Sequence, residues 1–361
     1  MKARRASVRL LYDTVNISKD IAPFLKSLTF SDNFEQADDL QVTLADPSGL
    51  WRTDWYPTKG AALKATILQS DWDEPGDTAE LYCGQFFIDE ITAQGPDETV
   101  TIKSRSVPVG TKEEAAGGEI MRRDKNRTWE NTTLKTIAAQ IADEAKLELH
   151  FKLAEDIPYK SRKQEKMSDL AFLQRLGYED GGDFRVKVSD KKLVIASAAE
   201  LEKDPPVAAA ERAAKEDAAR VVGSTVKGQI SSWSFTSSAN RQYRACTVSY
   251  YDAEAKQTYR ATVQGDDQET GQTLILCQRA ESQADAERIA RARLRQATMG
   301  VVKGDLAMIG DIRMVAGVNI DVKGFGVFDG KYFIDSATHT VDGSGGYKTS
   351  LRIHRGQEAK E

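Results

Sequence analysis

A short segment that occurs twice in the chain restricts its fold more than any other feature. Residues 82–89 read Tyr-Cys-Gly-Gln-Phe-Phe-Ile-Asp, and residues 328–335 read Phe-Asp-Gly-Lys-Tyr-Phe-Ile-Asp. Glycine near a strand start permits a bulge or a close backbone approach, and alternate aromatic residues face a core. Aspartate can end a strand by accepting hydrogen bonds from turn N–H groups. We therefore select four structural residues, which are Gly84, Asp89, Gly330 and Asp335.

The repeat extends in both directions from this segment. Residues 28–30 precede residues 40–42 at the separation at which residues 233–235 precede residues 245–247. A single short match arises easily by chance, whereas ordered matches at several places favour duplication. We therefore predict two superposable barrels, one over residues 7–107 and one over 226–355. The inserts differ: an acidic loop at 70–80 in the first copy, and a helix at 283–298 in the second.

The hydrophobic pattern agrees with β-structure in both copies. Residues 7–107 alternate apolar and polar positions in short runs separated by turn residues, which is typical of a half-buried antiparallel sheet. The alternation returns at 231–235, 245–250 and 259–263, and strands are expected again over 315–353. Ser282 and Asp285 occupy capping-box positions before the predicted helix.

Between the copies the pattern changes to a helical period. Residues 133–146 place apolar side chains on one face, and Asn131 or Thr132 is the expected cap. A second helix is expected from Ser168-Asp169 to Gly177, with oxygens of both first residues accepting N–H groups of the first turn. Strands at 184–188 and 192–195 complete an α+β module.

These patterns predict a mainly β protein with an α+β insertion: two tube-protein-like antiparallel β-barrels and a small helical module. The expected domains are a first barrel at 1–111, the α+β module at 112–198, a connector at 199–225 and a second barrel at 226–361, with its helical insert at about 280–299. The connector is rich in alanine and in charges of both signs, so we expect it to be exposed and partly helical.

Composition excludes several classes of protein. The formal net charge of -5 argues against a dedicated nucleic-acid binder, which needs a basic surface. Neither a signal peptide nor a transmembrane-length apolar run is visible, so synthesis in the cytosol is expected. Cys83, Cys246 and Cys277 are far apart in strand-like stretches, and we expect buried, inert thiols.

No group of residues favours catalysis, a metal or a cofactor. His339 and His354 could meet across neighbouring strands, but no third ligand has suitable spacing. The glycines at 324, 326 and 330 lead into a strand, where a dinucleotide loop would lead into a helix. Carboxylates in two predicted loops could form a glycosidase pair or a calcium loop, although solvated charge is the ordinary explanation: Asp71, Asp73 and Glu74, and Asp266, Asp267 and Glu269.

The helix expected after Met167 carries the most specific resemblance to a known family. Its sequence resembles the Ser-Asp-x-x-Phe-Leu-x-Arg-Leu motif of phage late control gene D proteins, the baseplate hubs of contractile tails, and the matching region of type VI secretion spike proteins. The motif residues are Ser168, Asp169, Phe172, Leu173, Arg175 and Leu176. The order of residues 37–40, Gly60 and 82–89 is similar to that family too. Gly177, where alanine is more usual, and Met167, where an acidic residue often stands, depart from the pattern beside the helix.

The resemblance implies a structural role in a phage tail, a tailocin or a related injection particle. Three chains, each with two tube-like barrels, would form a pseudo-sixfold ring that adapts a sixfold tail tube to a threefold spike. The implied partners are the homotrimer, the tail tube protein, a separate spike protein and other baseplate proteins. Nucleic acid would only pass through the channel, and neither a membrane nor a cofactor is implied. The protein would be made in the bacterial cytoplasm and built into the baseplate.

A hydrolase that cuts cell-wall polymer is the alternative, because some tail-tip proteins carry a lytic domain. A third domain with a catalytic motif would favour it, and the sequence shows none. We therefore expect a non-enzymatic assembly protein.

Overall fold

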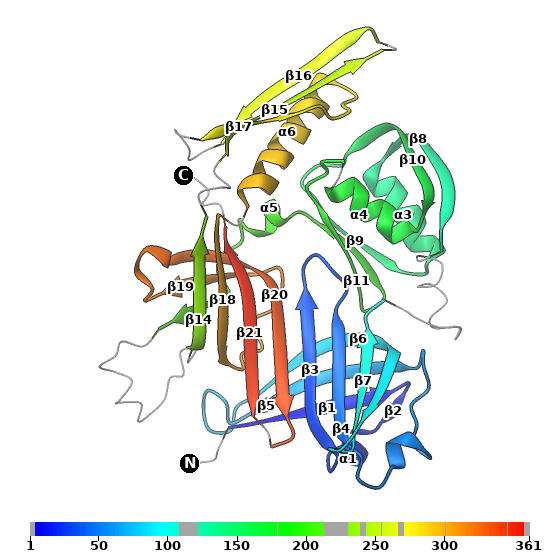
Figure 1. Ribbon diagram of the computed structural model, residues 1–361, viewed down its shortest axis with the longest axis vertical. Helices are drawn as coiled ribbons and strands as arrows, with labels where there is room; N and C mark the ends of the chain where they lie inside the picture. The colour runs from blue at the N-terminus through cyan, green and yellow to red at the C-terminus, as the bar shows by residue number, and fades with distance from the viewer. Residues whose placement is uncertain are drawn as a thin grey trace.

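The computed structural model describes residues 4–107, 121, 123–178, 180–212, 230–238, 243–253, 255–265, 271–299, 301–344 and 346–356. The chain is mainly β, as predicted, and its largest element is a sheet of thirteen strands (Figure 1). None of the described helices has the length and apolar character needed to cross a bilayer.

The first half of the large sheet is formed by residues 5–105. Its strands run in the order β3-β4-β7-β6-β5-β1-β2. Leu40, Val42 and Leu44 of β4 are buried and alternate with more exposed polar residues, so one face of this antiparallel sheet covers a core. The elements are β1 (Arg5–Tyr12), β2 (Val15–Asn16), α1 (Ser18–Ile21), β3 (Leu25–Asn33), β4 (Asp39–Ala45), η1 (Leu50–Arg52), β5 (Ala62–Ser70), β6 (Thr78–Gln94) and β7 (Thr99–Arg105).

The second half repeats the strand order of the first. The pairings β14-β18-β21-β20-β19-β13 correspond to β3-β4-β7-β6-β5-β1, except that β13 runs parallel to β19 whereas β1 runs antiparallel to β5. The sequence repeat thus reflects a repeated topology. The elements are β13 (Ala208–Glu211), β14 (Ile230–Ser237), β18 (Val302–Ile309), β19 (Asn319–Lys323), η4 (Gly326–Phe328), β20 (Gly330–Asp342) and β21 (Tyr347–Arg355).

One correspondence drawn from the sequence is wrong. Residues 28–30 and 233–235 do occupy the equivalent strands β3 and β14, but the equivalent of β4 is β18, and residues 245–247 lie in β15 of a separate sheet. The insert of the second half is therefore a whole module rather than a single helix. It consists of β15 (Tyr243–Asp252), β16 (Gln257–Gln264), β17 (Gln272–Leu276) and α6 (Gln283–Thr298), and α6 packs on β15 and β16.

The two halves do not form two closed barrels. The last residues of β20 pair with β3, so both halves belong to one sheet, and no pairing among the described strands closes either half. Val341 and Tyr347 of the second half also pack into the core of the first. The reason is the length of β20: its first residues pair with β19, and its last residues extend far enough to reach β3 (Figure 1).

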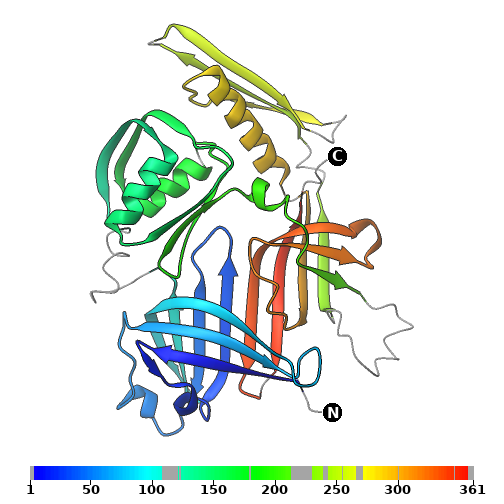
Figure 2. The ribbon, with the colours of Figure 1, turned by 180° about the vertical axis from the view of Figure 1, so that it is seen from behind.

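The middle module has the predicted α+β character. It consists of β8 (Lys125–Thr133), α3 (Leu134–Glu144), β9 (Glu148–Lys152), β10 (Pro158–Met167), α4 (Asp169–Tyr178), β11 (Arg185–Ser189) and β12 (Lys192–Ala196). The cap of α3 is Thr133, whose hydroxyl accepts from the Thr136 N–H at 3.3 Å, and not Asn131 or Thr132. The middle module and the insert both lie beyond one end of the upright strands of the large sheet (Figures 1 and 2).

The predicted exposed connector is only partly correct. A short helix α5 (Ala198–Leu201) begins it, but β13 then pairs with β19 and Ala210 is fully buried. The small alanine side chains allow this strand to pack closely against the core of the second half. Residues 213–225 of the expected connector lie outside the described residues.

Candidate functional site

The repeated glycine and aspartate mark the same backbone distortion in both halves. Gly84 and Gly330 have positive φ angles of 108° and 139°. Five residues later, Asp89 and Asp335 each interrupt the ladder with β7 or β21 as one extra residue, which is a β-bulge. The expectation that these aspartates end their strands is wrong, because β6 and β20 continue beyond them.

Each bulge aspartate faces a basic side chain at the same register position. Asp89 lies 3.5 Å from Arg105, whereas Asp335 lies 2.8 Å from Nδ1 of His354. Arg105 is paired with Phe87, and His354 with the equivalent Phe333. The first pair is exposed to solvent, but the second lies beneath other modules and extends into a larger network.

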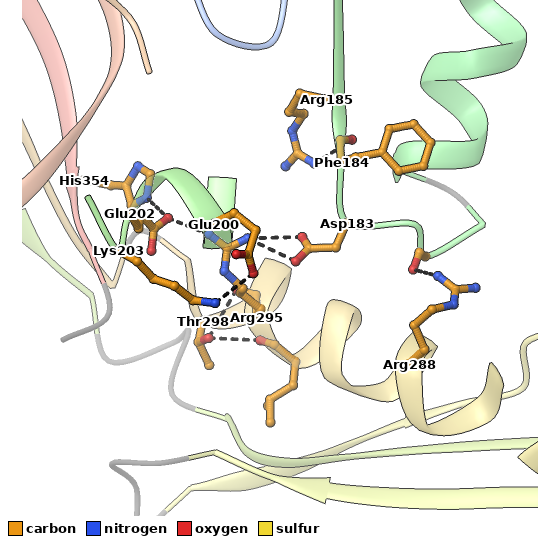
Figure 3. Close-up of polar contacts among 12 residues, drawn as sticks. Asp183, Phe184, Arg185, Glu200, Glu202, Lys203, Arg288, Arg295, Thr298 and His354 are labelled. Carbon is orange, nitrogen blue, oxygen red and sulfur yellow. Dashed lines mark hydrogen bonds and ion pairs between the residues drawn. The ribbon is translucent and has the colours of Figure 1, made fainter. Parts of the chain in front are cut away.

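That network joins four parts of the chain around a buried histidine. We call Asp183, Glu202, Arg295 and His354 the polar junction. Glu202 lies 3.1 Å from Nε2 of His354 and 2.5 Å from Arg295, and Arg295 in turn lies 3.1 Å from Asp183 (Figure 3). The residues come from β21, from the turn after α5, from α6 and from the loop before β11, so these parts are fixed to one another.

The electrostatics of the polar junction favour a charged histidine. Burial acts to lower the pKa of His354, but hydrogen bonds to Asp335 and Glu202 outweigh it and raise the pKa to about 9. His354 is therefore an imidazolium at neutral pH. Removing Glu202 would leave two buried cations, His354 and Arg295, with one carboxylate partner each, which is destabilising.

A second buried cluster holds the middle module on the first half of the sheet. Lys187 of β11 places its ammonium 2.6 Å from Asp32 and 2.7 Å from Asp38. Burial raises the pKa of Asp38 to about 7, against the attraction of Lys187. Sequence analysis missed this cluster, although Asp32 carried a signal: it continues the buried positions Leu28 and Phe30 of β3.

The family-motif residues lie in and beside α4 and build the core of the middle module. Ser168 caps the helix, since its hydroxyl accepts from the Ala171 N–H at 3.2 Å. Phe172 is fully buried and stacks on Trp129 with ring centroids 6.3 Å apart. Leu173 and Leu176 are also fully buried. We assign these four motif residues to the stability of the module.

The two charged motif residues have different contacts. Asp169 was expected to cap the helix, but its buried carboxylate lies 2.5 Å from Lys125 and accepts from the Gln164 amide at 2.8 Å. Arg175 donates to the backbone carbonyl of Lys163 at 2.6 Å, and its guanidinium lies 5.3 Å from the Phe172 ring centroid. Both residues therefore join α4 to the two-stranded sheet of β8 and β10.

The departure at Gly177 has a steric explanation. A Cβ at this position would lie 2.3 Å from the backbone oxygen of Phe184, which is far inside van der Waals contact. The glycine thus lets the chain that leads into β11 pass against α4.

The groups considered for chemistry do not converge. In the described part of the chain no three His, Cys, Asp or Glu residues are grouped to hold a metal. Of the loop carboxylates at 71–74, Asp71 accepts from the Gly76 N–H at 2.7 Å and so shapes its own turn. The other acidic cluster, at 266–269, lies outside the described residues. The expectation of three buried thiols is wrong for Cys277, which is exposed just after β17, where its strand has ended.

Several strand edges of the large sheet have no partner among the described residues, and those of β14 and of the end of β6 are two of them. β14 pairs only with β18, and residues 90–94 of β6 pair only with β7. Trp233 of β14 is 46% exposed. Unpaired edges are templates for pairing with another chain.

Comparison with known proteins agrees with this architecture. The family model described as phage tail baseplate hub (GPD) matches residues 120–345. The chain belongs to this family. Its members are structural proteins, which agrees with a non-enzymatic role, and no feature of the described residues supports the hydrolase alternative.

Relatives and solved structures extend the comparison. The chain is 33% identical over 186 residues to the probable baseplate hub protein of Escherichia phage P2, covering 50% of this chain and 42% of that protein. The match to the phage 186 protein, at 30% identity, likewise covers less than half of the relative, 47%.

Solved structures of other proteins share the fold of this chain over almost its whole length. The 43 kDa tail protein of prophage MuSo2 from Shewanella oneidensis has a TM-score of 0.66 at 13% identity, covering 97% of this chain and 98% of that one. The E. coli c3393 protein, described as a component of the type VI secretion system, has a TM-score of 0.52 at 11% identity, covering 99% and 79%. These likenesses show that the fold is that of tail proteins.

Proposed function

We propose that the protein is the hub ring of a contractile tail or a related injection particle, with three copies per ring joining the tail tube to the spike. The repeated strand order is the observation that carries the proposal. A sixfold partner is matched by three chains only if each chain supplies two near-equivalent surfaces. The family match and the tail-protein fold support the same role.

The parts that occur once per chain suit contact with a threefold spike. The middle module and the 243–298 insert have no counterpart in the other half, and both lie beyond the same end of the large sheet (Figures 1 and 2). We propose that they reduce the sixfold equivalence to threefold there. The other partners in the proposal are the tube protein at the sheet and further baseplate proteins around the rim.

The 70–80 loop, which also occurs once, has a different role. Its Trp72 is buried, donates to the backbone carbonyl of Gly310 at 2.8 Å and lies 5.6 Å from the Tyr347 ring centroid. The loop therefore fastens the first half to the second within one chain.

The experiment is electron microscopy of the purified particle that contains this chain. Three copies in one ring at the junction of tube and spike are expected. Six copies per ring, or one, would refute the proposal even with both half-sheets present. A monomer on a sizing column would not decide the matter, because rings of this kind can form only when the partners are present.

A further inference from the structure

The junction between the two halves within one chain shows how an unpaired edge is filled. In β20, residues 330–333 pair with β19, and residues 336–342 pair with β3 along the same edge. The equivalent stretch of β6 follows the last pairing with β5, and none of the described strands pairs with its corresponding edge. The equivalent of β3 is β14, whose outer edge likewise has no partner in the described part of the chain. Each chain thus has the two strand edges that a second junction of the same kind would need.

The bulges give the register on one side of that junction. Thr92 is the third residue beyond Asp89, and Thr338 is the third residue beyond Asp335. Because both aspartates are the extra residue of equivalent bulges, Thr92 and Thr338 hold equivalent positions.

The ladder across the sheet gives the register on the other side. Ser31 and Thr236 occupy the same step of two equivalent series of pairs. These series are Ser31–Asp39–Arg105 in the first half and Thr236–Lys303–His354 in the second. Since Ser31 pairs with Thr338 within the chain, Thr236 is the residue that should face Thr92.

We infer that residues 90–94 of one copy pair antiparallel with residues 234–238 of a second copy, with Thr92 opposite Thr236. This inference rests on the proposed ring and specifies its contact between copies. Each copy offers one edge of each kind, on opposite sides of the row of upright strands, so the contact is heterologous (Figure 1). Such a contact closes a ring when the rotation between neighbouring copies is one third of a turn, as the proposed ring of three requires.

Side-chain sizes along the two edges support this register. Within the chain, Leu28 is paired with Val341, and both are buried. At the equivalent step between copies, Trp233 would meet Gly95, which has no side chain. The exposed indole of Trp233 would then lie against the Gly95 backbone, where no side chain stands in its way.

The next step of the ladder repeats the complementarity. Within the chain, Phe30 stacks on His339 with ring centroids 5.9 Å apart. Between copies, the half-buried Phe235 would face the exposed Ala93. A large side chain on β14 therefore faces glycine or alanine at both steps.

The contact between copies is shorter than the one within the chain. Pro96 stands where β20 has Asp342, and proline has no N–H to donate to a ladder. The pairing therefore ends near Gly95, and a strand pair of this length is marginal in water on its own. Its formation depends on the assembled particle, which is where it must be tested.

The test is disulfide crosslinking in assembled particles. Cys277→Ser removes the exposed thiol, and Thr92→Cys is combined with Thr236→Cys in that background. On oxidation we expect bands at two and three times the chain mass on a non-reducing gel. The positive control is Ser31→Cys with Thr338→Cys, which should close a bond within one chain because these residues are paired. The off-register control is Thr92→Cys with Ser232→Cys, in which the second cysteine is displaced by about 13 Å along the strand.

The possible outcomes test the strand register and the proposed function separately. A ring of three in micrographs without a crosslink at Thr92 and Thr236, while the control within the chain forms, overturns the register and leaves the hub role standing. An equal crosslink in the off-register variant overturns it as well. Particles without a ring of this chain overturn the proposed function itself.

Discussion

Replacing Phe172 by alanine tests whether the family motif acts by packing. The Phe172 ring is fully buried between Trp129 and the Arg175 guanidinium, so the change removes a complete ring and leaves a cavity. Such changes cost about 3–5 kcal/mol. Domain stabilities lie at roughly 5–15 kcal/mol, so the middle module would lose a large part of its free energy of unfolding. Its melting temperature should fall by roughly 12 °C or more.

Hydrogen exchange measured by mass spectrometry suits this prediction, because it reports on the middle module separately from the large sheet. Protection of peptides from α4 and β8 should fall by at least about 100-fold. Gln174→Ala, at an exposed position of the same helix, is the matched control and should change stability by less than about 0.5 kcal/mol. Equal protection in the Phe172→Ala and control variants would refute the packing role.

Three further predictions follow from the contacts described above. Gly177→Ala, although it restores the more usual family residue, should destabilise the middle module by roughly 1–3 kcal/mol in thermal melts, because its Cβ would collide with Phe184; an unchanged melt would contradict this. The raised pKa of His354 stabilises the fold fully below pH 6.5, and this contribution should be lost as pH rises through about 9; Glu202→Gln should flatten that part of a pH–stability curve. Cys277 should react with a thiol reagent in the native protein while the two buried cysteines react only after unfolding, and modification of all three at one rate would contradict the structure.

The repeated strands could be predicted from the sequence because their backbone distortion needs particular residues. Gly84 and Gly330 both adopt positive φ, which few other residues tolerate, so the pattern persisted in both copies. The motif helix was also visible, since its capping serine and buried side chains are close in sequence and follow one helical period. Local signals of this kind are sufficient to predict individual helices and strands and to detect the repeat.

The errors concern contacts between residues that are distant in sequence. Residues 245–247 have a strand pattern, but no local signal shows that their strand joins α6 rather than the large sheet. The same holds for β13, whose alanines resemble a connector until β19 supplies a partner more than 100 residues later. The polar junction combines residues of four segments, and only the final packing reveals that Glu202 and Arg295 are buried together.

The pairing of β3 with β20 also determines when the first half can be completed during synthesis. Asn33 at one end of this contact pairs with Ser336, so about 300 residues must be translated before the edge of β3 is covered. At 5–20 residues per second, that edge stays open on the ribosome for roughly 15–60 s. Contacts of such sequence separation are slow to form, and an open strand edge invites pairing with other nascent chains. Efficient production of this protein therefore depends on keeping nascent chains apart until the C-terminal strands emerge.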